Sequence, residues 1–167
     1  MLTSNKELAE RLRKLRAHWF DDEQHFMHSQ MAYGGRMTDM QGAVGLTQHR
    51  RRNELLEQRQ QIASWYTEIL GRSNRFTLPM RTRGAAWWVF PLIARTHTDM
   101  LEARKALADA GVETRSYFMP MHLQPWLTQY ADREFPVAED LYRRGFYLPL
   151  YPGMEPADVE YICNVLN

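Results

Sequence analysis

The chain has 167 residues, which is enough to bury one hydrophobic core but argues against a complete two-domain enzyme. Lys and Arg total 21 against 20 Asp and Glu, and a formal net charge of +1 excludes a global field that would recruit nucleic acid or an anionic membrane. The single cysteine, Cys163, excludes an internal disulfide framework. With no signal peptide and no bilayer-spanning apolar run, we expect a soluble, cytoplasmic protein that binds neither nucleic acid nor membrane.

The first 37 residues predict one helix followed by an irregular loop. Ser4 and Glu7 have the spacing of a capping box, and the leucines that follow recur at helical spacing for roughly three turns. Residues 17–37 lose this periodicity. Gly34 and Gly35 permit backbone angles that other residues avoid, so we interpret this segment as a functional loop.

A long helix is expected next. Thr38 and Gln41 form a second capping box, and an apolar stripe then continues until Gly71 can end the helix. Its middle part, residues 49–61, is rich in Arg, Glu and Gln. That composition suits a helix that crosses solvent or lies on another subunit.

The second half of the chain mixes strands and helices. The expected elements are strands over residues 75–79 and 87–94 with a polar connector at 81–84, a helix from Thr98 to Ala110 ended by Gly111, a third strand over 112–118, a short helix over 137–144, an extended segment over 147–150 and a closing helix from Pro156 to Leu166. This order predicts the α+β class: a small antiparallel sheet covered by helices, with a long helix on its N-terminal side. We expect three parts, residues 1–37, 38–72 and 73–167.

Four ordered strings carry a resemblance to a known family. They are residues 2–13, residues 33–46 (Tyr-Gly-Gly-Arg-Met-Thr-Asp-Met-Gln-Gly-Ala-Val-Gly-Leu), residues 120–125 (Pro-Met-His-Leu-Gln-Pro), and residues 135–139 with 148–153. Together they resemble the DegT/StrS family of sugar aminotransferases, which are fold-type I enzymes that use pyridoxal phosphate. In that family the second string is usually Tyr-Asn-x-Arg-Met-Thr/Ser-Asp-x-Gln-Ala-Ala-x-Gly. The fold expected from this resemblance is that of the small C-terminal domain.

The resemblance also implies a function. A parent protein would transfer an amino group, with glutamate as donor, to a nucleotide-linked keto sugar in amino-sugar biosynthesis. It would act as a homodimer, formed through the loop and the long helix. An alternative stays open, in which the chain is a non-catalytic interaction module or a truncated remnant that pairs with a full-length aminotransferase subunit.

Such chemistry needs a lysine that forms a Schiff base with the cofactor. The three lysines here, Lys6, Lys14 and Lys105, fall on exposed faces of expected helices, whereas a Schiff-base lysine needs a desolvated or positively charged setting. The family places its lysine before the segment with which this chain begins. We therefore expect no catalytic residue and no activity in this chain alone, with Met1 either internal to a longer protein or the start of a truncated reading frame.

Six residues are candidates for the site. His122, Tyr33 and Trp88 are candidates for substrate binding, and Gly34, Gly35 and Arg36 are candidates for contact with the cofactor phosphate. The family typically has Asn where this chain has Gly34, so backbone amides and the Arg36 charge would have to replace it. The competing interpretations are an ion pair for Arg36, hydrogen bonds to loop carbonyls for His122, and simple packing for Tyr33 and Trp88.

Two further clusters of polar residues suggest other functions, and we favour neither. A metal site is conceivable at His18, Asp21, Asp22, His25 and His28, but the segment lacks a clear helix signal, and we expect no metal. The basic run at residues 49–52 is followed by acidic residues at ion-pairing distance along a helix. We interpret that run as a solvated helix face.

Overall fold

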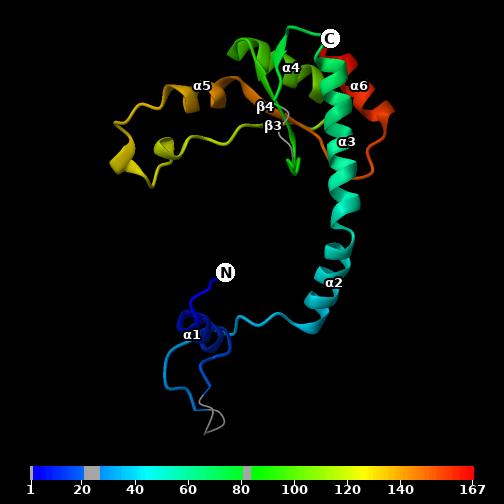
Figure 1. Ribbon diagram of the computed structural model, residues 1–167. Coiled ribbons are helices and arrows are strands. Elements are labelled where there is room, and N and C mark those ends of the chain that lie inside the picture. The colour runs from blue at the N-terminus through cyan, green and yellow to red at the C-terminus, as the bar shows by residue number, and fades with distance from the viewer. Residues whose placement is uncertain (1, 21–26, 81–83) are drawn as a thin grey trace. The chain divides into compact units, whose positions relative to one another are not determined.

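A computed structural model describes residues 2–20, 27–80 and 84–167 (Figure 1). The chain divides into two compact units, Met1–Arg51 and Arg52–Asn167. In the described part of the chain, no helix combines the length and the apolar character needed to cross a bilayer.

The boundary between the units falls inside the helix expected over residues 38–72. Helix α2 spans Asp39–Arg50 and helix α3 spans Arg52–Leu70, so the prediction of one continuous helix is wrong. At Arg51 the backbone has φ −87° and ψ 0°, and its N–H donates to the carbonyls of Gln48 and His49. No residue of α2 is buried, so no packing forces the helix to continue through this polar stretch.

Helix α1, Lys6–Arg16, and helix α2 both begin with side-chain caps. At α1 the cap is Asn5, whose side-chain oxygen accepts from the Leu8 N–H at 3.0 Å, so the capping box expected at Ser4 is wrong. Asn is as effective an N-cap as Ser, and here it lies one residue closer to the helix. At α2 the capping box of Thr38 and Gln41 is confirmed.

The second unit contains a four-stranded antiparallel sheet. Its strands are β1 (Phe76–Thr77), β2 (Phe90–Ala94), β3 (Arg115–Ser116) and β4 (Gly145–Leu148), in the order β1-β2-β4-β3. The strands expected over 75–79, 87–94 and 112–118 are therefore confirmed, although β1 and β3 keep two residues each. The extended segment expected over 147–150 begins earlier, at Gly145, and becomes a central strand.

Besides α3, this unit contains α4 (His97–Asp109), α5 (Pro136–Arg144) and α6 (Pro156–Leu166), with short 3₁₀ turns at Met121–Leu123 and Thr128–Tyr130. The closing helix has the predicted bounds. Helix α4 starts earlier than predicted, because Thr96 and not Thr98 is the cap. The Thr96 hydroxyl accepts from the Asp99 N–H at 3.1 Å, and the Asp99 carboxylate accepts from the Thr96 N–H at 3.0 Å.

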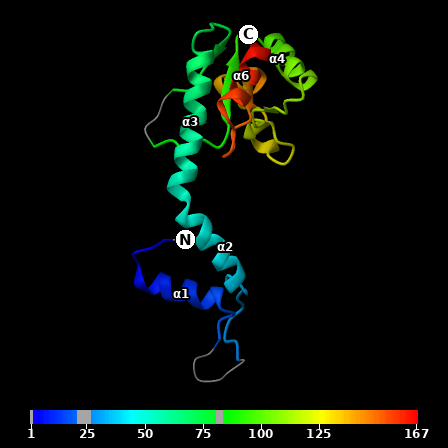
Figure 2. The same ribbon diagram turned by 90° about the vertical axis from the view of Figure 1, so that its right-hand side faces the viewer.

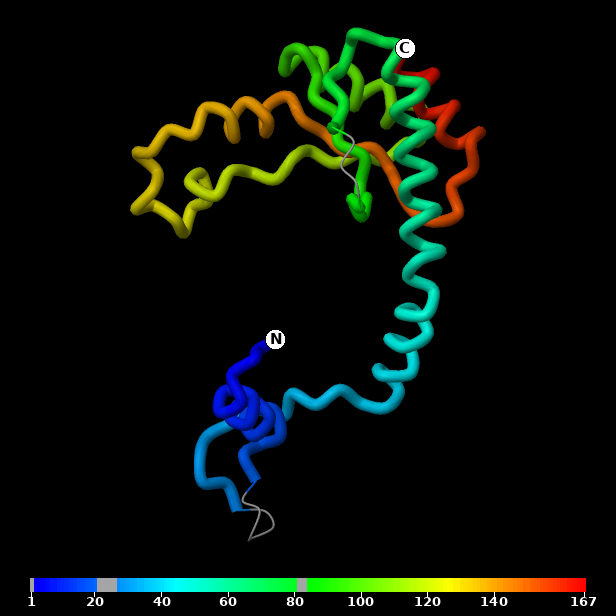
Figure 3. Tube along the Cα trace, viewed as in Figure 1, coloured from blue at the N-terminus to red at the C-terminus, as the bar shows by residue number. Residues whose placement is uncertain are grey.

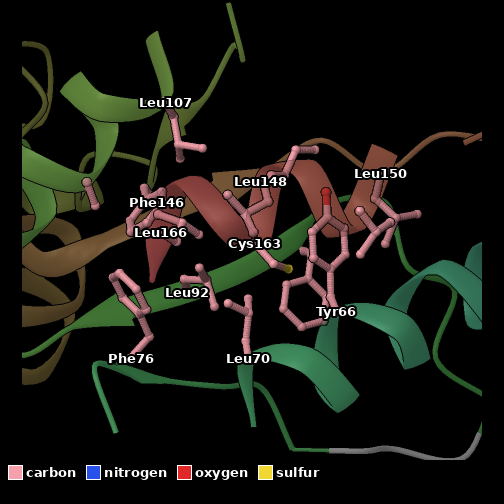
Figure 4. Close-up of a cluster of buried hydrophobic side chains, with 14 of the residues drawn as sticks. Tyr66, Leu70, Phe76, Leu92, Leu107, Phe146, Leu148, Leu150, Cys163 and Leu166 are labelled. Atoms are coloured by element: carbon pink, nitrogen blue, oxygen red, sulfur yellow. The ribbon is translucent and has the colours of Figure 1, made fainter. Parts of the chain in front are cut away.

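Helices α3, α4 and α6 bury one face of the sheet (Figures 2 and 4). Alternation along the strands places Phe90, Leu92, Phe146 and Leu148 on this face, all of them at most 1% exposed. Tyr66 of α3 stacks on Phe90 with ring centroids 4.8 Å apart. This packing confirms the expected small antiparallel sheet covered by helices.

Between β3 and β4 the chain leaves the sheet and returns to it (Figure 3). The outgoing part is the loop with the two 3₁₀ turns, and the returning part is α5. Many large apolar side chains of this excursion are exposed, including Met121, Leu123 and Trp126. The excursion carries the predicted site residue His122.

We expect Leu92→Ala to lower the free energy of unfolding of this chain by about 2–5 kcal/mol, since it removes buried methyl groups and leaves a cavity in the core. Urea denaturation measures the loss. Leu101→Ala is the matched control, because Leu101 lies on α4 with half of its surface exposed, and its effect should stay within about 0.5 kcal/mol. Equal losses for the two variants would contradict the core described above.

Candidate functional site

The predicted cofactor loop, residues 33–36, forms backbone hydrogen bonds with the end of α1. Ala17 and Gly34 form an isolated antiparallel bridge. The Tyr33 N–H donates to Leu15 O at 3.0 Å, and the Gly35 N–H donates to Arg16 O at 2.9 Å. The backbone of the loop is therefore fixed within its own unit.

The side chains of this loop are free for other contacts. Tyr33 is 74% exposed, so packing within its own unit does not explain it. Arg36 is also exposed and forms no ion pair with a described carboxylate, in contrast to the competing interpretation. The loop thus presents a phenol and a guanidinium to its surroundings.

The two glycines do not use unusual backbone angles, and that expectation is wrong. Neither Gly34 nor Gly35 has a positive φ. The positive φ angles of this region belong to His18 (62°) and Trp19 (51°). These two residues directly follow Ala17, the partner of Gly34 in the bridge. What distinguishes the glycines is the lack of a side chain.

Trp88 lies two residues before β2 and is 59% exposed. Its ring stacks on Phe118, with centroids 6.2 Å apart and planes 11° from parallel. Beneath it, Nη1 of Arg59 lies 2.8, 3.2 and 3.3 Å from the carbonyl oxygens of Trp87, Trp88 and Leu150. A fixed backbone therefore supports an exposed, flat aromatic pair, in which Trp88 packs on Phe118 and leaves more than half of its own surface open.

The aromatic pair continues across the sheet. Phe118 contacts Tyr147 at 6.2 Å, and Tyr147 stacks on Tyr117 at 4.6 Å. Burial, followed by the neighbouring Tyr147, raises the pKa of Tyr117 to about 12, so this phenol stays neutral at physiological pH. Trp88, Phe118, Tyr147 and Tyr117 thus form an aromatic row. Sequence reasoning missed Phe118 and Tyr147, because this row brings together residues from three separate segments of the chain.

His122 is 7% exposed and bonded to a carboxylate. Its Nε2 lies 3.0 Å from Oε1 of Glu139 on α5, and its ring packs on Phe135 at 4.8 Å. The interpretation that loop carbonyls satisfy this ring is thus not what the structure shows. When Nε2 donates to Glu139, Nδ1 carries the lone pair, and it forms no hydrogen bond with a described residue.

Glu139 collects several donors. The Phe135 N–H donates to Oε1 at 3.1 Å, and Arg143 lies 3.5 Å from Oε2. The Phe135 amide, followed by His122, lowers the pKa of Glu139 below its usual range. The carboxylate therefore remains ionised and fixes the orientation of the imidazole.

A separate cavity of about 530 Å³ opens beside β3, β4 and α6. It is lined mainly by apolar and tyrosine side chains, with Arg115 and Asp158 among the polar groups: Val89, Gly111, Val112, Glu113, Arg115, Tyr147, Leu148, Pro149, Tyr151, Met154, Asp158, Tyr161 and Ile162. None of the six predicted site residues lines it. The cavity shares Tyr147 with the aromatic row.

The lysines lie where a Schiff base is not favoured. Lys6 and Lys14 are exposed on α1, and Lys105 pairs with Asp109 at 2.6 Å on the exposed face of α4. For a metal, no group of three or more His, Cys, Asp or Glu side chains is suitably arranged among the described residues. Asp21, Asp22 and His25 of the cluster weighed above lie outside those residues.

Comparison with known proteins decides the family. The family model of the DegT/DnrJ/EryC1/StrS aminotransferases matches residues 1–167. The chain belongs to this family. It is 28% identical over 167 residues to the GDP-perosamine synthase of Escherichia coli O157:H7, covering 100% of this chain and 46% of the relative. It is 30% identical over 176 residues to the GDP-perosamine synthase of Caulobacter vibrioides, covering 100% of this chain and 47% of that relative.

Solved structures of the family share the fold. An aminotransferase of the same family from Brucella abortus superposes with a TM-score of 0.82 at 26% identity, covering 99% of this chain and 44% of that chain. PseC from Helicobacter pylori, an aminotransferase involved in the biosynthesis of pseudoaminic acid, superposes with a TM-score of 0.85 at 20% identity, covering 98% and 46%. The chain thus spans about half the length of the relatives that it matches.

Because the Phe135 amide, followed by His122, lowers the pKa of Glu139, we expect this carboxylate to make stability depend on pH. Because the folded pKa of Glu139 is lowered, its contribution is fully present above the unfolded pKa of about 4.3 and is lost as pH falls through the folded pKa. We expect Glu139→Gln to be less stable than wild type at pH 7, and the difference to shrink below about pH 4.3. Urea denaturation across this range measures the trend.

The matched control is Glu134→Gln, which changes an exposed carboxylate that has no hydrogen bond to a described residue. It should show no such trend. Nitrogen-15 NMR of the wild-type chain should also find His122 as the tautomer with the proton on Nε2, because that atom faces the carboxylate. A pH-independent difference, or the opposite tautomer, would contradict the geometry.

Proposed function

We propose that this chain is part of a pyridoxal-phosphate-dependent aminotransferase that moves an amino group from glutamate to a keto sugar linked to a nucleotide. The observation that carries the proposal is the family match over all 167 residues. Relatives named GDP-perosamine synthase support a sugar that is attached to a nucleotide. The activity would belong to amino-sugar biosynthesis in the cytoplasm.

Within this proposal the chain supplies binding groups and not the Schiff-base lysine. Pyridoxal phosphate, when bound, would provide the electron sink for amino transfer. The exposed loop of Tyr33, Gly34, Gly35 and Arg36 fits an anionic group, because its guanidinium has no described carboxylate partner and its backbone is held by α1. We assign this loop to the cofactor phosphate, in a homodimer formed through residues 38–72.

The second unit would hold the sugar substrate. The flat pair of Trp88 and Phe118 can cover the apolar face of a sugar ring, since both rings are more than half exposed and held parallel. His122 can accept a hydrogen bond from a substrate hydroxyl through Nδ1, because Glu139 occupies Nε2. The carboxylate positions the imidazole without touching the substrate.

The alternative, a non-catalytic module or remnant that pairs with a full-length subunit, has one supporting observation. Met37, Met40, Val44 and Leu46 are each at least half exposed on or beside α2. Several large apolar side chains exposed along one helix and the segment before it support contact with another polypeptide. Both proposals use this surface, and the presence or absence of amino transfer separates them.

The full-length protein encoded by the gene should transfer label from nitrogen-15 glutamate to a nucleotide-linked keto sugar, detected by mass spectrometry with GDP- and UDP-linked sugars as acceptors. The 167-residue chain alone should transfer none, because its lysines are exposed or ion-paired. Absence of transfer by the full-length protein would favour the non-catalytic alternative.

The chain alone provides a second readout. After incubation with pyridoxal phosphate and borohydride, peptide mapping should find no stoichiometric reduced adduct on any one lysine. Lys105→Arg is the control for adventitious labelling, as it removes one accessible amine and keeps the charge that pairs with Asp109. A stoichiometric adduct confined to a single lysine would show that this chain holds its own Schiff-base residue.

A further inference from the structure

The His18 side chain occupies the space above Gly34, and the Arg16 side chain lies beside Gly35. A Cβ placed on Gly34 would lie 2.5 Å from Cε1 and 3.0 Å from Nε2 of His18. A Cβ on Gly35 would lie 3.6 Å from Cγ of Arg16. The imidazole of His18 therefore takes the room that a side chain at position 34 would fill, whereas a Cβ at position 35 would make only an ordinary van der Waals contact with Arg16.

The position of His18 is set by several contacts. Its N–H donates to Tyr33 O at 3.2 Å, and its own carbonyl accepts from Nδ1 of His28 at 2.7 Å. Its ring meets the ring of Phe20 edge-on, with centroids 5.8 Å apart. These contacts hold His18 at a φ of 62°, a conformation that is unfavourable for a non-glycine residue and that persists where the surroundings impose it.

Among the described residues, the charged side chains in the last turn of α1 and at position 36 are basic. Arg16 and Arg36 are exposed, and neither forms an ion pair with any described carboxylate. The described carboxylates of this unit are Glu7 and Glu10, in the first half of α1, and Asp39, in the first turn of α2. The last turn of α1 adds Arg13 and Lys14, which outweigh the roughly half negative charge of a helix C-terminus.

We propose that His18 and Arg16 complete an anion site on the segment Gly34–Gly35–Arg36, with a phosphate monoester as its ligand. The imidazole is a hydrogen-bond donor held against a glycine that has no side chain of its own, and two guanidiniums supply charge. Identifying the phosphate as that of pyridoxal phosphate rests on the proposed function. Anion binding itself does not.

Phosphate binding to the 167-residue chain tests the site. Inorganic phosphate and pyridoxal phosphate are the probes, and titration is followed by the NMR signals of the His18 ring and by calorimetry. His18→Ala and Arg16→Gln should each weaken binding about tenfold or more, as expected for loss of one charge-assisted hydrogen bond. Arg11→Gln, which removes an exposed charge from the same helix outside its last turn, is the matched control and should weaken binding less than threefold.

A second set of variants, which changes the space available to the His18 ring, tests the site even if His18→Ala perturbs the loop. Gly34→Ala should displace the imidazole and weaken phosphate binding, because its Cβ would overlap the ring. Gly34→Ala combined with His18→Gly should remove the overlap, so the double variant should bind no worse than His18→Gly alone. His18→Asn, which keeps a donor on a smaller side chain, should restore part of the affinity lost in His18→Ala.

Two results would overturn the inference: phosphate affinity that His18→Ala leaves unchanged, or His18 ring signals that Gly34→Ala leaves unchanged. The outcome is separate from that of the proposed function. A full-length protein that transfers amino groups while this chain's phosphate binding ignores His18 refutes the anion site alone. Phosphate binding that depends on His18, without amino transfer by the full-length protein, refutes the proposed function alone.

Discussion

The second unit depends on the pairing of β4 with two strands at once. Phe146 and Leu148 of β4 are buried against the helices, and the strand pairs with β2 on one side and with β3 on the other. Because β3 precedes β4 in the chain and lies beside it, residues 117–144 must leave the sheet and return. Gly145 is needed at the point of return, since a Cβ there would lie 2.6 Å from the Tyr117 ring and 2.5 Å from Leu141 O. The placement of His122 and Glu139 follows from this one constraint.

Much of the fold could be predicted, because its signals are local. The closing helix has the predicted bounds, as Pro156 can occupy only the first turn and the apolar spacing continues to Leu166. The Thr38 capping box was also readable from spacing alone. The start of α4 was predicted wrongly because two nearby residues could each serve as its N-cap. Thr96 and Thr98 can each cap α4, and the carboxylate at position 99 selects Thr96.

The site was less predictable, because its contacts join distant parts of the chain. His122 and Trp88 were proposed from residue type and position, but the side chains that they contact, Glu139 and Phe118, lie 17 and 30 positions away. Nothing in the local sequence points to these pairs. Gly34 was recognised as a departure from the family pattern, yet the feature that explains its fit, the ring of His18, depends on a bridge between residues 17 and 34. Sequence periodicity carries no information about such a bridge.

Arg59 holds the main chain at Trp88 through contacts that do not depend on which side chain is present there. Its guanidinium lies on the carbonyl oxygens of residues 87, 88 and 150, and a carbonyl is present whatever side chain its residue carries. Ring size and polarity at position 88 can therefore drift through mutation while the main chain beneath stays anchored. Substitution at position 88 would then change the exposed aromatic surface and leave in place the hydrogen bonds that hold the main chain there.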